Sequence, residues 1–317
     1  MKIGYFLSCE EFGPRELVRQ ARLAEEAGFS ALWISDHFHP WNDEQGESPF
    51  VWSVIGALAE ATSLPVTTAV TCPTLRIHPA VMAQAAATSA ALLGDDRFIF
   101  GVGTGEALNE HILGDHWPNA DVRLEMLEEA IEIIRELWTG KQVTHDGTHY
   151  VVENARIYTL PDTPPPIYVS GFGPKAIEVA ARIGDGFCTV GPDDGAIRQF
   201  RENGGGDKPV QAGAKVCFGD DEAACKQTAH RLWPNESLPG ELAQILPTPA
   251  HFEQAAELVT EDMVAESVPC GPDLDRHVAS LKEYADAGVD EVYVQQIGPE
   301  QDAFFRAYSE TVLPKFS

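Results

Sequence analysis

Two short segments place histidine, tryptophan and carboxylate side chains directly after strand-like apolar runs. Residues 35–41 read Ser-Asp-His-Phe-His-Pro-Trp and follow the run 31–34. Residues 101–111 read Gly-Val-Gly-Thr-Gly-Glu-Ala-Leu-Asn-Glu-His and follow the run 98–100. A histidine and a carboxylate can move protons near neutral pH, and an indole packs well against a flat ring. The two segments therefore predict acid–base chemistry on a ring-shaped group.

Each of these residues also has a purely structural interpretation. His37 or His39 could be an ordinary hydrogen-bonded loop histidine, and Glu106 could be a helix N-terminal carboxylate that interacts with the helix dipole. The run 170–173, Ser-Gly-Phe-Gly, could be only a tight turn between a strand and a helix. The joint occurrence of the three groups after strand-like runs favours the functional interpretation.

Strand-like and helix-like segments alternate along the 317 residues and must position these side chains. The expected strands are 2–8, 30–35, 65–71, 97–102, 166–170, 185–190, 209–218 and 290–296. The expected helices are 14–28, 50–62, 78–93, 120–139, 173–183, 194–203, 220–232, 273–287 and 300–314. The strands are short and continuously apolar, which is typical of strands buried on both faces.

Eight strands with intervening helices predict an α/β fold, a (β/α)8 TIM barrel, formed by a single domain over residues 1–317. The alternative is an open doubly wound sheet, which would need a glycine-rich dinucleotide fingerprint after the first strand. The first strand is followed by Ser8-Cys-Glu-Glu-Phe-Gly13, which is not such a fingerprint. Two stretches interrupt the alternation: 141–158 predicts a hairpin inserted before the fifth strand, and 234–250 predicts a loop near the active-site mouth.

In a barrel, the loops that follow the carboxyl ends of the strands build the active site. The candidates after the second strand are Asp36, His37, His39 and Trp41. Those after the fourth strand are Glu106 and Asn109, and the run Ser170–Gly173 follows the fifth. We expect all of them to meet on one face of the barrel.

Composition excludes several classes of partner. The formal net charge is −27, from 49 acidic and 22 basic residues, which argues against binding to nucleic acid or to an anionic membrane. No apolar run reaches the length of a membrane span, and no signal peptide is recognised. Six scattered cysteines show no metal-ligand spacing, so we expect free thiols in a reducing cytoplasm and no metal site.

Four motifs together resemble the luciferase-like deazaflavin enzymes. They are Ser35-Asp-His-Phe-x-Pro-Trp41, Thr71-x-Pro-Thr-x-Arg76, Pro79-Ala-Val-x-Ala-Gln84 and Gly101-Val-Gly-Thr-Gly-Glu-Ala-Leu-Asn-Glu110. Within that group the chain is most similar to dehydrogenases that use coenzyme F420, typified by the glucose-6-phosphate dehydrogenases of mycobacteria. The resemblance implies a luciferase-like TIM barrel, F420 as cofactor, a small sugar or alcohol as substrate, and a homodimer.

The resemblance also implies roles for individual residues. His37 matches the base that removes the substrate hydroxyl proton, Trp41 the ring that steadies the reacting centre, and Glu106 the acid that protonates the deazaflavin near N1. The matched cofactor contacts are Asp36, Asn109, a non-prolyl cis peptide at Ala69-Val70, and a phosphate-holding region of Ser170, Gly171, Phe172, Gly173 and Thr189. Because the cofactor tail is polyanionic and the protein is acidic, backbone N–H groups at a helix N-terminus, with Lys175 nearby, would supply local positive potential.

One departure from the family pattern concerns the substrate. The glucose-6-phosphate enzymes bring three basic side chains to the substrate phosphate. The matching positions here are Pro192 or Asp193, the neighbourhood of Ala243, and Ala265 or Glu266, none of which is basic. Unless His251 or Arg276 substitutes, a phosphate dianion would be poorly compensated, so we expect an unphosphorylated sugar or secondary alcohol.

Three alternatives remain at this point. The chain could be an FMN-dependent monooxygenase or reductase of the same superfamily, or an F420-dependent glucose-6-phosphate dehydrogenase. It could also be a non-catalytic flavin-binding relative that kept the barrel. The set of His37, Trp41 and Glu106 argues against this last alternative, because a protein that only binds needs no proton-transfer groups.

The acidic, lysine-poor composition predicts a response to salt. The chain has 8 lysines against 14 arginines, a bias that suits a high-salt cytoplasm, although high genomic GC content would produce it too. If surface carboxylates repel one another, the melting temperature should rise between low and molar KCl, because the Debye length shrinks to ~3 Å near 1 M. A melting curve series in KCl at fixed pH tests this. A flat profile, or a maximum near ~0.1 M where screening is already substantial, would favour the compositional explanation.

Overall fold

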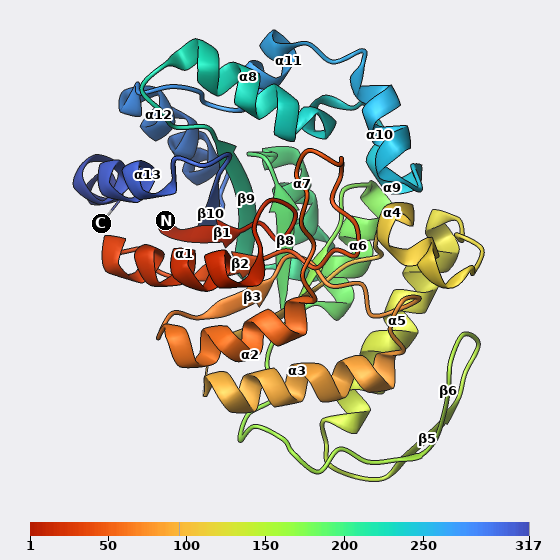
Figure 1. Cartoon of the computed structure of the whole chain (residues 1–317). Coiled ribbons are helices and arrows are strands. Elements are labelled where there is room, and N and C mark those ends of the chain that lie inside the picture. The colour runs from red at the N-terminus through yellow and green to blue at the C-terminus, as the bar shows by residue number, and fades with distance from the viewer. Residues whose placement is uncertain (95, 317) are drawn as a thin grey trace.

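Eight parallel strands close into a barrel in the computed structural model, which describes residues 1–94 and 96–316 (Figure 1). The strands are β1 (Lys2–Leu7), β2 (Leu32–Ile34), β3 (Val66–Thr68), β4 (Phe98–Val102), β7 (Ile167–Ser170), β8 (Gly186–Val190), β9 (Val210–Val216) and β10 (Glu291–Gln296). Their order around the barrel is β1-β10-β9-β8-β7-β4-β3-β2, and β1 pairs with both β10 and β2. The predicted TIM barrel is therefore confirmed, and the open doubly wound sheet is excluded.

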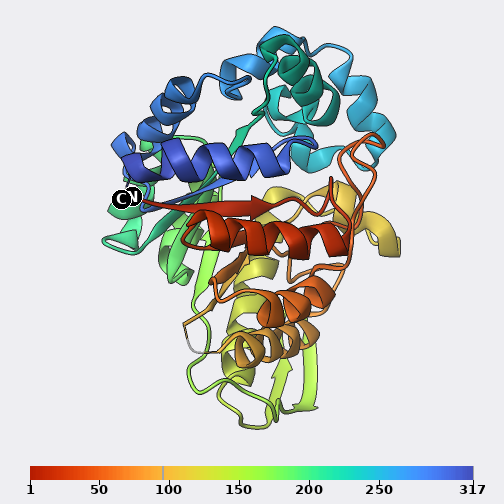
Figure 2. The same cartoon turned by 60° about the vertical axis from the view of Figure 1, so that its left-hand side comes forward.

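Helices cover the outside of the barrel at the predicted places. They are α1 (Pro14–Ala27), α2 (Val51–Ala61), α3 (Pro79–Leu93), α5 (Ala120–Leu137), α6 (Pro174–Ile183), α7 (Asp194–Phe200), α8 (Glu222–Leu232), α12 (Leu274–Asp286) and α13 (Gln301–Ala307). Local sequence explains the ends of α1. Pro14 occupies its first turn, where no N–H is needed, and Gly28 ends it with a φ of 96°. The N- and C-termini lie close together in both views (Figures 1 and 2).

Aromatic side chains fill the barrel interior. Trp33 stacks on Tyr293 with ring centroids 4.7 Å apart, and its Nε1 donates a hydrogen bond of 2.8 Å to Gln211 Oε1. Gly4 makes room for this layer, since a Cβ there would lie 2.4 Å from the Tyr293 ring. Because the interior is filled by side chains, the chemistry is confined to the mouth of the barrel.

Two insertions extend from opposite ends of the molecule (Figures 1 and 2). Strands β5 (Val143–Asp146) and β6 (Val151–Ala155) pair antiparallel, which confirms the predicted hairpin. The prediction of a loop over 234–250 is wrong. Short helices occupy most of it: η3 (Pro234–Ser237), α9 (Leu242–Ile245) and α10 (Pro249–Ala256), followed by α11 (Glu261–Ser267). The prolines that suggested a loop instead begin two of these helices, where a missing N–H costs nothing.

One apolar surface lies over α2 and α3. Phe50, Val81 and Leu92 are each more than half exposed, and with Trp52 and Ile77 they line a hollow of about 330 Å³. Helix α3 contains no charged residue and α2 contains only Glu60. Among the described residues, no helix combines the length and apolarity needed to cross a membrane.

Candidate active site at the carboxyl ends of the barrel strands

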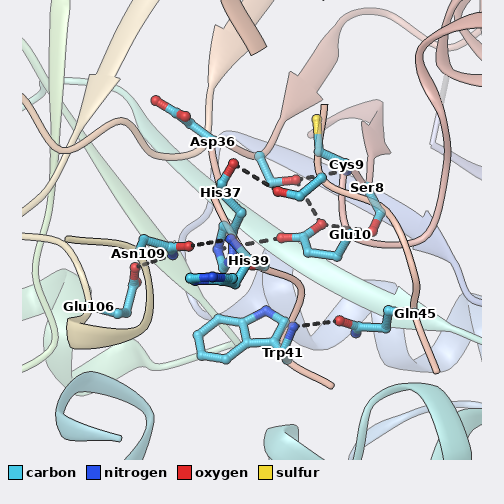
Figure 3. A network of polar contacts seen from close by, with 12 residues as sticks. Ser8, Cys9, Glu10, Asp36, His37, His39, Trp41, Gln45, Glu106 and Asn109 are labelled. Carbon is cyan, nitrogen blue, oxygen red and sulfur yellow. Dashed lines mark hydrogen bonds and ion pairs between the residues drawn. The ribbon is translucent and has the colours of Figure 1, made fainter. Parts of the chain in front are cut away.

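The loops after β1, β2 and β4 bring the predicted acid–base residues together at one end of the barrel (Figure 3). His37 follows β2 and Glu106 follows β4, with Asn109 of the short helix α4 (Ala107–Glu110) lying beside both segments. Strand ends therefore position these side chains as the sequence predicted.

His37 is held by polar contacts at both ring nitrogens. Nδ1 lies 3.1 Å from the carbonyl oxygen of His39, and Nε2 lies 3.4 Å from Glu10 Oε1. Both nitrogens face an oxygen acceptor, so either can carry the proton of the neutral imidazole. When both carry a proton, the buried carboxylate of Glu10 would stabilise the charged ring.

Glu10 is a residue that the sequence reasoning missed. Its side chain is only 3% exposed, and its Oε2 accepts hydrogen bonds of 2.8 Å from the hydroxyls of Ser8 and Ser35. These donors compensate a carboxylate that has been removed from water. Glu10 lies just past β1, so the rule that located the residues after the second, fourth and fifth strands, applied to the first, would have found it.

Trp41 connects His37 to the inserted helices. Its ring centroid lies 5.0 Å from that of His37, and also 5.0 Å from that of Phe252 on α10, in an edge-to-face arrangement. Its backbone N–H donates to Gln45 Oε1 at 2.8 Å. The indole is thereby fixed between His37 and α10. Gly240, Glu241 and Gln244 line the cavity beside Glu106, so the segment 234–250 lies near the barrel mouth as predicted.

Helix α4 holds the histidine loop in place. Asn109 Oδ1 accepts hydrogen bonds from the backbone N–H groups of Phe38 (2.9 Å) and His39 (3.2 Å), while Nδ2 donates to Glu106 Oε2 at 3.4 Å. The Asn109 side chain thus joins the segment of His37 to the carboxylate of Glu106. Its direct contact with a cofactor stays a prediction.

A buried ion-pair cluster also joins the loop of His37 to the helix that follows Glu106. Arg76 Nη2 donates to Asp36 Oδ1 at 2.8 Å, and Thr71 Oγ1 donates to Asp36 Oδ2 at 2.8 Å. The Arg76 backbone N–H donates to Glu110 Oε2 at 3.0 Å, and burial raises the pKa of Glu110 to about 7 although Arg76 opposes that shift. Both Asp36 oxygens are engaged and point away from the imidazoles (Figure 3), so the cofactor contact predicted for Asp36 stays a prediction.

A cavity of about 380 Å³ opens beside Glu106, between the ends of β4 and β7 and the starts of α5 and α6. Its lining includes several residues predicted to hold the cofactor: Val70, Ser170, Gly171, Phe172 and Gly173. The peptide bond between Ala69 and Val70 is cis, as the resemblance implies. Thr189 is buried and does not line this cavity, and its hydroxyl lies 3.5 Å from the carbonyl oxygen of Val190.

The cavity wall fits a flat ring that carries an anionic tail. A Cβ on Gly103 would lie 2.8 Å from Val70 Cγ2, and one on Gly171 would lie 2.8 Å from the Ala176 carbonyl carbon, so both glycines keep the wall close to the backbone. Helix α6 begins at the cavity with no side-chain cap, which leaves N–H groups of its first turn free for an anion. Lys175 also lines the cavity, exposed and 2.8 Å from Asp121. In the described ranges, no group of three or more histidine, cysteine, aspartate or glutamate side chains is arranged to hold a metal ion.

Comparison with known proteins identifies the family. Residues 1–291 match the model of the luciferase-like monooxygenase family. The chain belongs to this family. A relative from Amycolatopsis mediterranei (strain U-32), named F420-dependent glucose-6-phosphate dehydrogenase, is 38% identical over 332 residues. The match covers 99% of this chain and 98% of the relative. A relative with the same name from Microbacterium testaceum (strain StLB037) is 36% identical, with coverage of 99% and 97%.

A solved member of the same fold shows how closely the whole chain is matched. The structure of an F420-dependent secondary alcohol dehydrogenase in complex with an F420–acetone adduct superposes with a TM-score of 0.92 at 30% identity. It covers 100% of this chain and 99% of its own. The resemblance drawn from the four motifs is therefore confirmed at the level of family and fold.

Proposed function

We propose that this protein is an F420-dependent dehydrogenase that transfers a hydride from the hydroxyl-bearing carbon of a sugar or alcohol to C5 of the deazaflavin. The main observation is the Glu106 carboxylate in the wall of a cavity that fits a flat ring with an anionic tail. Asn109 joins this carboxylate to the loop of His37, which pairs with Glu10. The names of the relatives and of the solved neighbour support the cofactor and the reaction on a CH–OH group.

The side chains divide the work of an alcohol oxidation. When bound, the deazaflavin supplies a two-electron acceptor for the hydride. His37 removes the hydroxyl proton, and Glu10, whose Oε1 lies 3.4 Å from Nε2, stabilises the resulting imidazolium. Trp41 excludes water from one side of the reacting carbon. Glu106 lines the cavity and provides a proton at its wall, where Asn109 orients the carboxylate.

Charge at the barrel mouth supports an uncharged substrate. Lys215, near the end of β9, already pairs with Glu236 at 2.9 Å and lies 4.4 Å over the Trp233 ring. Arg276, a candidate substitute for the missing basic residues, donates instead to the carbonyl oxygen of Ala265 and lies 3.6 Å from Glu222. A phosphate dianion would have to compete with these acids for a cation, which is costly away from water. Glucose-6-phosphate remains the second candidate, because it is in the names of both curated relatives.

Cofactor titration followed by a substrate panel tests this function. We expect micromolar or tighter binding of oxidised F420, weak binding of FMN, and loss of the oxidised deazaflavin absorbance with neutral alcohols or sugars. Oxygen consumption with reduced FMN serves as the control for monooxygenase activity.

Two results would contradict parts of this proposal separately. Tighter binding of FMN than of F420 in calorimetry would overturn the cofactor assignment. The highest kcat/KM with glucose-6-phosphate would overturn the uncharged substrate and leave the cofactor assignment standing.

Removing either proton-transfer group should slow turnover without losing the cofactor. His37→Ala should reduce kcat by ~10²–10⁴-fold, the usual contribution of a positioned acid or base, and Glu106→Gln should also change the pH–rate profile. Steady-state kinetics with F420 affinity measured alongside provides the readout. His145→Ala, on the distant hairpin, is the matched control and should leave kcat unchanged; near-normal rates in both active-site variants would mean that these residues only pack.

We also infer a homodimer formed through the α2–α3 surface. Two chains that each carry −27 repel one another, and this surface offers contact where the two helices contribute only one charge, Glu60. Phe50, Val81 and Leu92 would be covered by the same residues of a second copy, as two-fold symmetry allows.

Placing a charge on that surface should separate the two copies. Light scattering after gel filtration should give a dimer for the unchanged protein and a monomer for Leu92→Glu. Leu113→Glu, at another exposed leucine, is the matched control and should stay dimeric. A monomeric unchanged protein, or a Leu92→Glu variant that stays dimeric, would contradict the inference.

The state of the cysteine thiols indicates the cellular compartment in which the protein works. All six cysteines are free and buried, and burial raises the pKa of Cys9, Cys72 and Cys188. Free thiols suit a reducing environment. We therefore infer that the protein works in the cytoplasm.

A further inference from the structure

Arg123 is a buried cation that forms no ion pair with any acid among residues 1–94 and 96–316. It lies in the first turn of α5 and is only 5% exposed. Its Nη1 donates to the Pro118 carbonyl oxygen at 2.7 Å, and its Nη2 donates to Gln244 Oε1 at 3.3 Å. Glu106 and Glu241 act on it electrostatically without forming an ion pair. Buried arginines are usually paired, so this one calls for an explanation.

Two hydrogen-bond donors around this guanidinium have no acceptor. Arg123 Nε and Trp117 Nε1 are both buried and make no hydrogen bond within the described residues. The guanidinium carbon lies 4.5 Å from the centroid of the Trp117 ring, so the two donors belong to one small group. Buried donors are nearly always satisfied in native proteins, and an exception beside a cavity indicates an acceptor that arrives with a ligand.

The cavity beside Glu106 places this group opposite a second source of positive potential. Arg123 and Gln244 form part of its wall, and Gly173 and Lys175 at the start of α6 form another part. Helix α6 is ten residues long and lacks a side-chain cap, so its first-turn N–H groups face the same space. Lys175 contributes less, because it is exposed and pairs with Asp121. Glu106, Asp121 and Glu241 line the cavity as well, which confines the positive potential to Arg123 and the helix end.

We infer that Arg123, together with the N-terminus of α6, binds an oxyanion of the cofactor tail. The inference rests on the proposed F420 dependence and assigns a new residue to that site. Guanidinium groups bind phosphate and carboxylate through planar, charge-assisted hydrogen bonds, and the free Nε offers such a bond. Val70 and Gly103 would then hold the flat ring, and Arg123 with the start of α6 would hold the tail.

The experiment compares ligands that differ only in the tail. Fluorescence titrations measure the affinity of the unchanged protein for intact F420, for the deazaflavin that carries the phosphate without glutamyl residues, and for the ring and ribityl chain alone. Arg123→Met should weaken the binding of intact F420 by on the order of 10- to 100-fold, the value of a lost charged hydrogen bond. It should change the affinity for the tail-less ring by less than about twofold. If the ligand that carries the phosphate without glutamyl residues also binds more weakly, Arg123 contacts the phosphate. If only the glutamylated ligand binds more weakly, Arg123 contacts the glutamyl carboxylates.

Two further variants keep the test decisive. Arg123→Lys retains the charge without the planar donor set and should lose affinity for intact F420 by a smaller factor, so it replaces Arg123→Met if that variant does not fold. Arg135→Met is the matched control, since Arg135 lies on the same helix but pairs at the surface with Asp185, and it should bind all three ligands normally.

The inference is overturned if the Arg123 variants reduce the affinity for intact F420 and for the tail-less ring equally, or reduce neither affinity. Failure of the proposed function gives a different result, because the unchanged protein would then bind none of the three deazaflavins or would prefer FMN.

Discussion

The active-site face depends on one buried guanidinium, that of Arg76. It joins Asp36, the residue before His37, to Glu110, at the end of the helix that follows Glu106. Both carboxylates are almost completely buried, so removal of Arg76 would leave the Asp36 carboxylate without its ionic partner, which is destabilising. It would also raise the pKa of Glu110 further, because burial there already outweighs the lowering by Arg76. Arg76 therefore adds to the contacts of Asn109 in fixing the two irregular loops against each other.

The remaining contacts of the site follow from this connection. Once the loops are joined at Asp36 and Glu110, Asn109 can reach the N–H groups of Phe38 and His39, and its amide can reach Glu106. His37 is then presented to Glu10, which two serine hydroxyls hold after β1. Three strand ends contribute, and no residue of the acid–base set lies in regular strand structure. This arrangement shows why a barrel suits such chemistry. The closed sheet fixes the positions of the strand ends, and short polar contacts then orient the side chains in the loops.

The sequence was sufficient for the fold and for the location of the candidate site, for a physical reason. Alternation of apolar runs with helical periodicity is a local signal, and closure of eight parallel strands follows from it with little freedom. Placement at strand ends made His37, Trp41, Glu106 and the run Ser170–Gly173 candidates, and the same rule applied to the first strand would have added Glu10. The pairing of Arg76 and the surroundings of Arg123 could not be derived, because contacts between loops depend on distances that no local pattern encodes. The prediction of a loop over 234–250 is wrong because proline is common both in loops and in the first turn of a helix.

An overall charge of −27 works against binding of the anionic cofactor tail, and the proposed site answers this locally. Global electrostatics would repel such a ligand, but the repulsion is long-ranged and is screened over a Debye length. Inside the cavity the nearest groups decide instead, and there the free N–H groups of α6 and the buried Arg123 present positive potential over a few ångströms. Backbone dipoles add no net charge, so they leave the acidic surface unchanged. An acidic protein could therefore hold an anion by placing its few positive groups around one cavity, where the buried Arg123 acts more strongly than a cation at the surface would.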